Sequence, residues 1–224
     1  MKNMIDIYLQ PSKVFADQRE SPTFLVPLLF LVALTALLTT TYFWRVDPAW
    51  YADLMMESSG GELSASERAQ MRQMMPGTQV IGAIATVTGV LALIVVTVLT
   101  GVYAMVVGKF VTRPLTLRHG LSLAAWSSMP AALGLVVAMV GALTMSGDTS
   151  LESLMLTNVD PLMVELPKDH QWNGFAQSFS ILSFWSVFLF ALGWKVWTRS
   201  SWLQAALVSI VPTALIAGSM GLMT

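Results

Sequence analysis

Long uninterrupted runs of apolar residues dominate the chain, and the polar residues gather between them. A helix needs about 20 predominantly apolar residues to cross a bilayer core roughly 30 Å thick. Five runs meet this requirement, and none of them contains Asp, Glu, Lys, Arg or His. Because their apolar residues are continuous rather than alternating, they favour helices over the strands of a membrane barrel. The five predicted spans cover residues 24–44, 80–108, 121–145, 175–194 and 202–223.

The composition supports a membrane fold. Of the 224 residues, 55% are apolar and 11% are charged, whereas a soluble domain carries about 25% charged residues. A soluble globule of this size could not bury so much apolar surface. We therefore expect an all-α polytopic membrane protein, with residues 24–223 forming a single bundle of five transmembrane helices. Residues 1–23 are predicted to be a cytoplasmic interfacial segment, and residues 45–79 and 146–174 to be two longer outer loops.

Basic residues predict the orientation of the bundle. Eight lie before the first span or in the two short links, and four lie in the two longer loops. Because Lys and Arg are enriched on the cytoplasmic side, the N-terminus is expected in the cytoplasm and the C-terminus outside. Ten of the 13 acidic residues fall in the outer loops, which agrees with this orientation.

Short interfacial helices are predicted on both sides of the membrane. In the first outer loop, Asp47 followed by Pro48 has the pattern of a helix start, and Ser64 with Glu67 has the spacing of a capping box. The Gly60–Gly61 pair between them indicates a break, so this loop is expected to hold two helices. On the inner side, apolar residues before and after Pro11 favour short amphipathic helices.

Several segments resemble the Yip-one (Ypt-interacting-protein) domain family of small five-span membrane proteins. They are the Pro-x-x-x-Phe element at Pro11 and Phe15, the stretch TLRHGLSLAAWSSMPAALG, and the stretch FSILSFWSVFLFALGWKVWTRSSWLQAALVSIVP. The last combines a polar-aromatic span, the Gly193–Trp194 exit, a short basic turn and a final span with a proline. The resemblance implies a cytoplasmic N-terminus and a C-terminus across the membrane, and it offers no catalytic motif to transfer.

The chain also departs from the eukaryotic members of that family. Those members place a long cytosolic segment before the first span, whereas about 23 residues precede it here, and the first outer loop of about 33 residues is longer than usual. Both features resemble the bacterial branch, which implies a bacterial inner membrane location. Binding of prenylated Rab-type GTPases, which the eukaryotic members imply, is therefore not transferred to this chain.

The distribution of reactive side chains argues against several functions. Ionisable groups inside a membrane are usually functional, and their absence from the spans disfavours ion-coupled pumps and intramembrane proteases. The chain has no cysteine and no Gly-x-Ser-x-Gly elbow, so we expect neither enzyme activity nor a cofactor. Methionines of the first outer loop and acids of the second are candidate copper, calcium or zinc ligands, but packing and solvation explain them better. No basic run indicates nucleic acid.

Two prolines and nearby polar residues are the candidate site. Proline within a helix kinks it and frees a backbone carbonyl, and a serine within a turn can bond such a group. A stable kink is one interpretation; a hinge or a polar lining between the third and fifth spans is the other. Gln177 is the strongest uncharged polar group in the predicted spans. The candidate kink or lining residues are Pro130, Pro212, Ser127, Ser128, Ser209 and Gln177.

Small residues at intervals of four predict close helix packing, within the bundle or between copies. They are Gly134, Ala138 and Ala142 in the third span, and Ala214 with Gly218 and Ala217 with Gly221 in the fifth. Two functions remain open. One is a non-enzymatic membrane organiser or adaptor whose partners are lipids, other membrane proteins or a second copy. The other is a small-molecule or lipid permease with a path between the two kinked spans.

Overall fold

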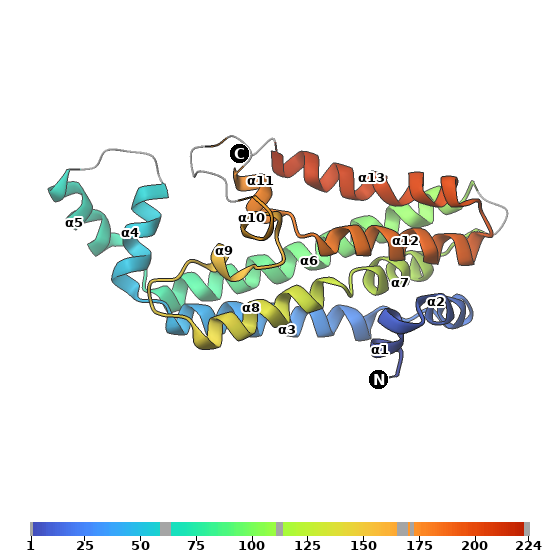
Figure 1. Ribbon diagram of the computed structural model, residues 1–224, viewed down its shortest axis with the longest axis horizontal. Coiled ribbons are helices and arrows are strands. Elements are labelled where there is room, and N and C mark those ends of the chain that lie inside the picture. The colour runs from blue at the N-terminus through green and yellow to red at the C-terminus, as the bar shows by residue number, and fades with distance from the viewer. Residues whose placement is uncertain (1, 59–63, 111–113, 165–169, 171–172, 222–224) are drawn as a thin grey trace.

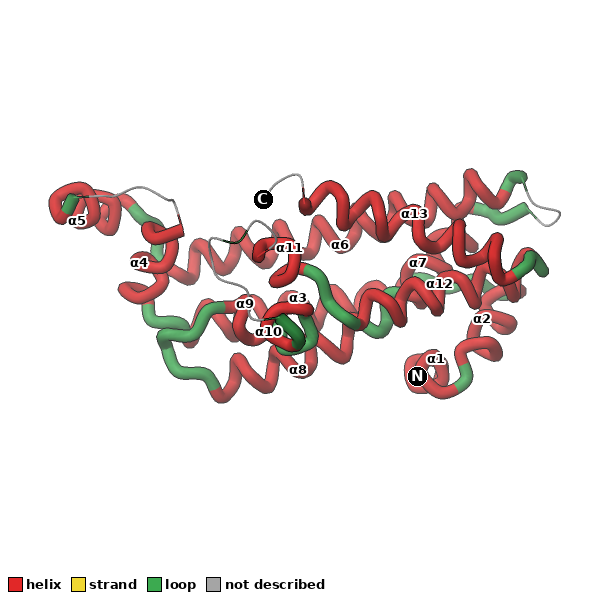
Figure 2. Tube along the Cα trace, turned by 45° about the horizontal axis from the view of Figure 1, so that its top comes forward, coloured by secondary structure: helices red, strands yellow, loops and turns green. Residues whose placement is uncertain are grey.

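The computed structural model describes residues 2–58, 64–110, 114–164, 170 and 173–221, and these residues are almost entirely helical (Figures 1 and 2). Six helices lie lengthwise along the molecule and form its body. They are α3 (Leu25–Arg45), α6 (Thr78–Gly108), α7 (Leu117–Ser127), α8 (Ala131–Thr144), α12 (Leu182–Thr198) and α13 (Trp202–Gly221). Within the described ranges, the β pairing is one isolated bridge between Asn158 and Ser180.

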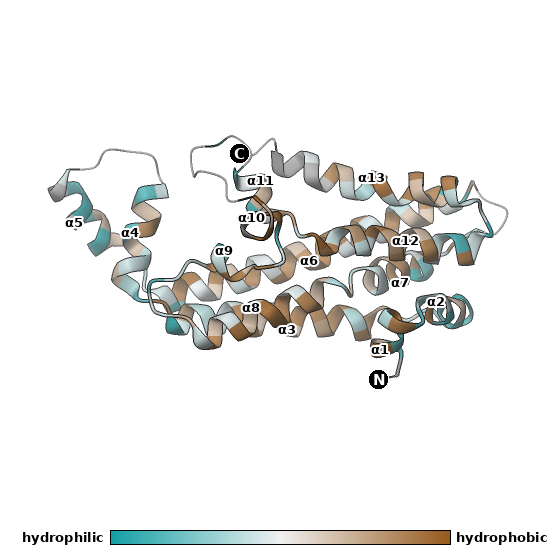
Figure 3. Ribbon diagram, viewed as in Figure 1, coloured by the Kyte–Doolittle hydropathy of each residue, from teal (hydrophilic) through white to brown (hydrophobic). Residues whose placement is uncertain are grey.

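The long helices carry the apolar residues of the chain (Figure 3). By length and composition, α3 and α6 can each cross a membrane, and α7 with α8, bent by 43° at their junction, make a third span if the pair is counted as one. With 31 residues, α6 is about 46 Å long, which exceeds the thickness of the bilayer core. Residues Leu182–Thr198 and Trp202–Leu215 form shorter apolar helices. The all-helical class is thus confirmed, with two or three helices long and apolar enough to cross a membrane, while five crossings stay a prediction.

Short helices occupy both ends of the body. At the end that carries the N-terminus lie α1 (Lys2–Leu9) and α2 (Pro11–Glu20), on either side of Gln10. At the opposite end, α4 (Pro48–Ser58) and α5 (Ala65–Met74) project from the first outer loop (Figure 1). The second outer loop forms α9 (Leu151–Leu154), α10 (Val159–Leu162) and α11 (Asn173–Ser178). The helices α1, α2, α4 and α5 match the short helices predicted for the N-terminal segment and the first outer loop, whereas those of the second outer loop were not predicted.

The N-terminal helices are part of the core rather than peripheral. Val14 and Phe15 of α2 are buried in one cluster with Leu123 of α7 and with Trp194 and Trp197 of α12. The Trp197 indole N–H donates a hydrogen bond to the backbone carbonyl of Phe15. Because Val14, Phe15 and Gln18 of α2 are buried while most of its charged residues are exposed, the start of the chain closes this end of the bundle.

The backbones of α6 and α7 approach each other closely. A Cβ atom added to Gly120 would lie 2.0 Å from the carbonyl oxygen of Gly101, and one added to Gly101 would lie 2.9 Å from the backbone nitrogen of Leu121. Only glycine at both positions allows the two backbones to approach this closely.

The fourth long helix begins later than the sequence indicates. The predicted span covers residues 175–194, whereas α12 covers Leu182–Thr198. The reason is a pairing with the second outer loop: the backbone N–H of Val159 bonds the carbonyl of Phe179, and the N–H of Ile181 bonds the carbonyl of Thr157, each at 2.9 Å. Residues 179–181 therefore use their backbone groups outside a helix, and α11 is a separate element before them.

Candidate functional site

A cavity of about 270 Å³ lies between α6, α7, α12 and α13, beside Pro212. Seven of its lining side chains carry a hydroxyl group, and the remaining ones are apolar. Three of the predicted serines, together with Pro212, line it. The hydroxyl residues are Thr100, Ser127, Ser128, Ser183, Ser186, Ser209 and Thr213.

The hydroxyl protons of the three predicted serines are already used within their own helices. Ser127 donates to the carbonyl of Leu123 at 2.6 Å, and Ser128 donates to that of Ala124 at 2.9 Å. Ser209 donates to the carbonyl of Ala206 at 2.9 Å. Since a hydroxyl has one proton and two lone pairs, these side chains offer the cavity hydrogen-bond acceptors. At these three positions the cavity thus suits ligand groups that bring their own donors.

The carbonyls freed by the prolines are satisfied by groups other than the serines, contrary to the expectation from the sequence. Pro212 cannot donate to the carbonyl of Val208, which instead accepts a 3.0 Å hydrogen bond from the hydroxyl of Tyr103 on α6. Pro130 cannot donate to the carbonyl of Trp126, which accepts from the backbone N–H of Met129 at 3.3 Å. Each freed carbonyl therefore has a donor, but no serine hydroxyl supplies it.

The α7–α8 junction is also held by the start of the chain. The hydroxyl of Tyr8 on α1 donates to the carbonyl of Met129 at 2.6 Å, and the Trp126 indole N–H donates to the carbonyl of Thr23 at 2.8 Å. The side chain of Gln18 accepts from Ser122 of α7 at 3.1 Å. Pro130, at the N-cap of α8, is buried beside this junction and is not a lining residue of the cavity.

Removing the Tyr103 hydroxyl tests how the Pro212 position is stabilised. We expect Tyr103→Phe to lower the free energy of unfolding by about 1 to 2 kcal/mol, because the half-buried carbonyl of Val208 loses its donor. In a Pro212→Ala background, residue 212 regains an N–H for the same carbonyl, so the cost should largely vanish. A double-mutant cycle from unfolding in detergent measures this coupling. Equal costs in both backgrounds would contradict the assignment.

Gln177 does not belong to the hydroxyl-lined cavity. It was expected one turn inside the fourth span, but it lies on α11, ahead of the residues that pair with the second outer loop. There it lines a second, larger cavity of about 810 Å³ at the outer end of the molecule. The two cavities share none of their described lining residues.

The outer cavity is lined by aromatic and acidic side chains from α3, α4 and the second outer loop. They include Trp50, Tyr51, Glu57, Asp148 and Glu152. Burial, and to a lesser degree the nearby Glu152 carboxylate, raises the pKa of Tyr51. No group of three or more described His, Asp or Glu side chains is placed to hold a metal ion. Two acids considered as ligands, Glu165 and Asp169, lie outside the described residues.

The predicted small-residue ladders differ in their surroundings. Ala138 and Ala142 are fully buried against α3, in a cluster with Leu38 and Tyr42. A Cβ on Gly134 would lie 2.8 Å from the hydroxyl oxygen of Thr157, so this ladder packs inside the molecule. On α13, Ala214 is exposed, and a Cβ atom added to Gly218 would have no neighbour within 4 Å among the described residues. The side-chain surroundings of Ala217 and Gly221 are outside the described part of the chain.

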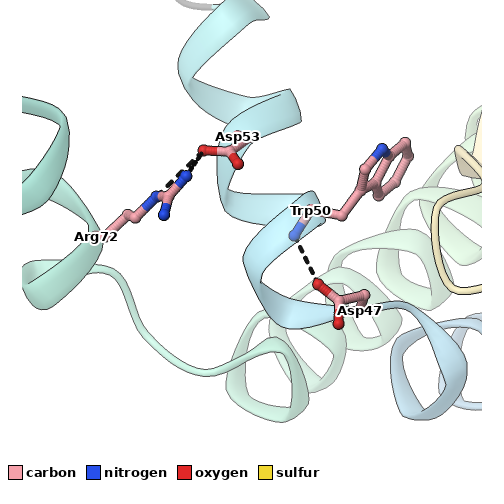
Figure 4. A network of polar contacts seen from close by, with 4 residues as sticks. All are labelled: Asp47, Trp50, Asp53 and Arg72. Carbon is pink, nitrogen blue, oxygen red and sulfur yellow. Dashed lines mark hydrogen bonds and ion pairs between the residues drawn. The ribbon is translucent and has the colours of Figure 1, made fainter. Parts of the chain in front are cut away.

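The described residues of the first outer loop, 47–58 and 64–74, form an arm that extends beyond the bundle (Figure 1). Asp47 accepts a 2.8 Å hydrogen bond from the N–H of Trp50, as its predicted N-cap position requires (Figure 4). Asp53 of α4 pairs with Arg72 of α5, which joins the two helices (Figure 4). The arm is tied to the second outer loop by a 2.8 Å hydrogen bond from the N–H of Asp47 to the carbonyl of Gly147.

Helix α5 begins with the predicted capping box. The Ser64 hydroxyl accepts from the N–H of Glu67 at 3.4 Å, and the N–H of Ser64 donates to the Glu67 carboxylate at 2.8 Å. All side chains described from Ser66 to Met74 are exposed. A helix that is polar and exposed all round has no packing face of its own in this chain, so the cap and the Arg72–Asp53 pair hold it.

Replacing Ser64 with alanine is expected to raise the pKa of the Glu67 carboxyl. Hydrogen bonds from the Ser64 hydroxyl and N–H lower that pKa, so the carboxylate supports α5 above the unfolded-state pKa and loses this support as the pH falls through the lowered value. An NMR titration of the Glu67 carboxyl carbon measures the change. Ser58→Ala, whose hydroxyl bonds the carbonyl of Leu54, is the control. An unchanged Glu67 pKa in Ser64→Ala would contradict the capping assignment.

Comparison with known proteins identifies a family but no closer relative. A family model described as the Yip1 domain matches residues 5–223. No curated protein and no solved structure matches the chain. The Yip1 family is a family of membrane proteins and is not an enzyme family. Since the match covers nearly the whole chain, from the N-terminal helices to the end of α13, the protein belongs to the Yip1 domain family.

Proposed function

We propose that this Yip1-domain protein is a non-enzymatic membrane organiser or adaptor that holds other membrane proteins through its outer arm. The observation that carries the proposal is the arm itself. Its second helix, α5, is exposed along every described side chain from Ser66 to Met74 and is joined to α4 by the Arg72–Asp53 pair. Because α5 is held away from the bundle, a partner can bind any face of this helix without a rearrangement of the bundle core.

The interior of the bundle supports an adaptor better than a permease. The hydroxyl-lined cavity and the outer cavity have separate linings, and the inner end is filled by Ile7, Val14 and Phe15 of the N-terminal helices. A continuous path would need these regions to join. In the described part of the bundle, the hydroxyl-lined cavity and the outer cavity are separate instead, and the inner end is packed.

The topology that accompanies this function has five crossings. We propose α3, α6, the α7–α8 pair, α12 and α13 as the five spans, in a bacterial inner membrane with the N-terminus in the cytoplasm. The excess of basic residues near α1, α2 and the short links supports this orientation. The arm would then lie outside the membrane, where it can meet the outer parts of other membrane proteins.

A photo-crosslinking amino acid at the tip of the arm tests the adaptor function. Met74 is 77% exposed on α5, and Leu37, 58% exposed on α3, is a control position on the apolar bundle surface. An adaptor should give a discrete protein adduct from position 74 in living cells and none of the same size from position 37. Absence of any protein adduct from position 74, or the same adducts from both positions, would contradict the proposal.

A lipid permease is the second candidate, because seven hydroxyl side chains line one cavity within the bundle. Vesicles that contain the purified protein and a fluorescent lipid test it, since a reductant added outside bleaches only lipids that reach the outer leaflet. The adaptor function predicts bleaching no faster than in protein-free vesicles. Faster bleaching that Ser127→Leu abolishes would favour the permease.

A further inference from the structure

A groove on the surface of the bundle runs between α12 and α13 and has a volume of about 410 Å³. Phe184 and Phe188 form its wall on α12, and Trp202 and Ile210 form its wall on α13. Its other walls include Ala191 and Ala206, whose small side chains leave the space open. The groove is thus almost entirely apolar, and it faces the surroundings of the bundle.

The large side chains of the groove are not covered by the rest of the chain. Phe184 is 65% exposed, Phe188 49% and Trp202 50%. Along α13, the eight helical rises from Trp202 to Ile210 correspond to about 12 Å, which is close to the thickness of one hydrocarbon leaflet. This length suits a single acyl chain that lies between the two helices.

One end of the groove carries a positive charge. The ammonium nitrogen of Lys195 lies 5.2 Å from the centre of the Trp202 ring, and the same ring stacks on Phe188 with their centres 6.2 Å apart. Lys195 forms no ion pair within the described residues, and the chain has no Asp or Glu after Asp169. The charge therefore remains available to an anion that lies above the aromatic pair.

We propose that the α12–α13 groove binds an anionic phospholipid, with one acyl chain between the helices and the phosphate at Lys195. Charge complementarity selects the headgroup, because Lys195 forms no ion pair with a carboxylate among the described residues. The Trp202 and Phe188 rings are placed where the headgroup region meets the acyl chain, a level that aromatic side chains favour. This site does not depend on the adaptor function, which concerns the opposite end of the molecule.

Quenching of Trp202 fluorescence by brominated lipids tests the site. Each variant is purified in detergent and compared with its Trp202→Phe counterpart, so that the difference reports position 202 alone. Brominated phosphatidylglycerol should quench at a concentration about fivefold lower than brominated phosphatidylcholine, since one basic residue near a lipid surface contributes about 1 kcal/mol. Lys195→Gln should abolish this preference, and Lys195→Arg should retain it.

Two further variants separate the site from general surface charge. The end of α6 lies at the same end of the bundle as the turn between α12 and α13 (Figure 1). Lys109, the C-cap of α6, is exposed and is not part of the groove, so Lys109→Gln should keep the preference. Ala206→Phe should fill the groove and weaken quenching by both lipids. A preference that survives Lys195→Gln, or that Lys109→Gln removes equally, would overturn the proposal, as would full quenching in Ala206→Phe.

Discussion

An alanine at position 120 is expected to destabilise the bundle by about 3 kcal/mol, near the upper end of the usual cost of overpacking. Its Cβ atom would lie 2.0 Å from the carbonyl oxygen of Gly101. Since the obstacle is backbone rather than the end of a flexible side chain, α6 and α7 would have to separate. Unfolding in detergent, monitored by the helical signal in circular dichroism, measures the loss of stability.

Gly89→Ala is the matched control, because it adds the same methyl group to a glycine of α6. There the nearest atom to an added Cβ is a methyl carbon of Thr35 at 3.7 Å, an ordinary contact. Helix propensity predicts that this variant is about 0.5 to 1 kcal/mol more stable. If Gly120→Ala unfolded at the same denaturant concentration as Gly89→Ala, the close crossing of α6 and α7 would be wrong.

Replacement of Phe15 by alanine is expected to lower the free energy of unfolding by about 3 to 5 kcal/mol, the usual range for a buried phenylalanine. The side chain is fully buried, and its ring centre lies 6.1 Å from that of Trp197 in an edge-to-face arrangement. Phe15→Ala would leave a cavity between α2 and α12 where the inner end of the bundle is closed. The same unfolding measurement reports the effect.

Leu9→Ala is the control for the N-terminal helices. Leu9 belongs to α1, but its side chain is 71% exposed, so the variant should lie within about 0.5 kcal/mol of the original protein. A small effect of Phe15→Ala, comparable with that of Leu9→Ala, would show that the N-terminal helices are peripheral and that the bundle is complete without them.

Much of the helical framework follows from local sequence. The apolar run predicted at 24–44 became α3, and the run at 80–108 became most of α6. The spacing of Ser64 and Glu67 also predicted the capping box correctly, because these residues form their reciprocal hydrogen bonds at the start of α5. Such features depend on residues within one or two turns of each other, so the pattern along the chain suffices to find them.

Features that depend on distant residues were not predictable in the same way. Nothing near Pro212 indicates that Tyr103, 105 residues from Val208, would bond the freed carbonyl. The late start of α12 depends on pairing with residues 157–159, which also removes Gln177 from the fourth helix. In contrast, Ser183 and Ser186 have the three-residue spacing of one helix face, a local signal that would have added them to the cavity lining.

The central claim is a bundle of five crossings with the arm on the opposite side of the membrane from the N-terminal helices. Because the chain has no cysteine, single cysteines can be introduced without background and labelled with a maleimide that does not cross membranes. Labelling in intact spheroplasts is predicted for cysteines that replace Met74, Ser153 and Thr224. Cysteines that replace Lys13, Lys109 and Ser201 should react only after the membrane is disrupted. Labelling at position 109 or 201 from outside, or protection at position 74, would contradict the five-span topology and the proposed outer arm.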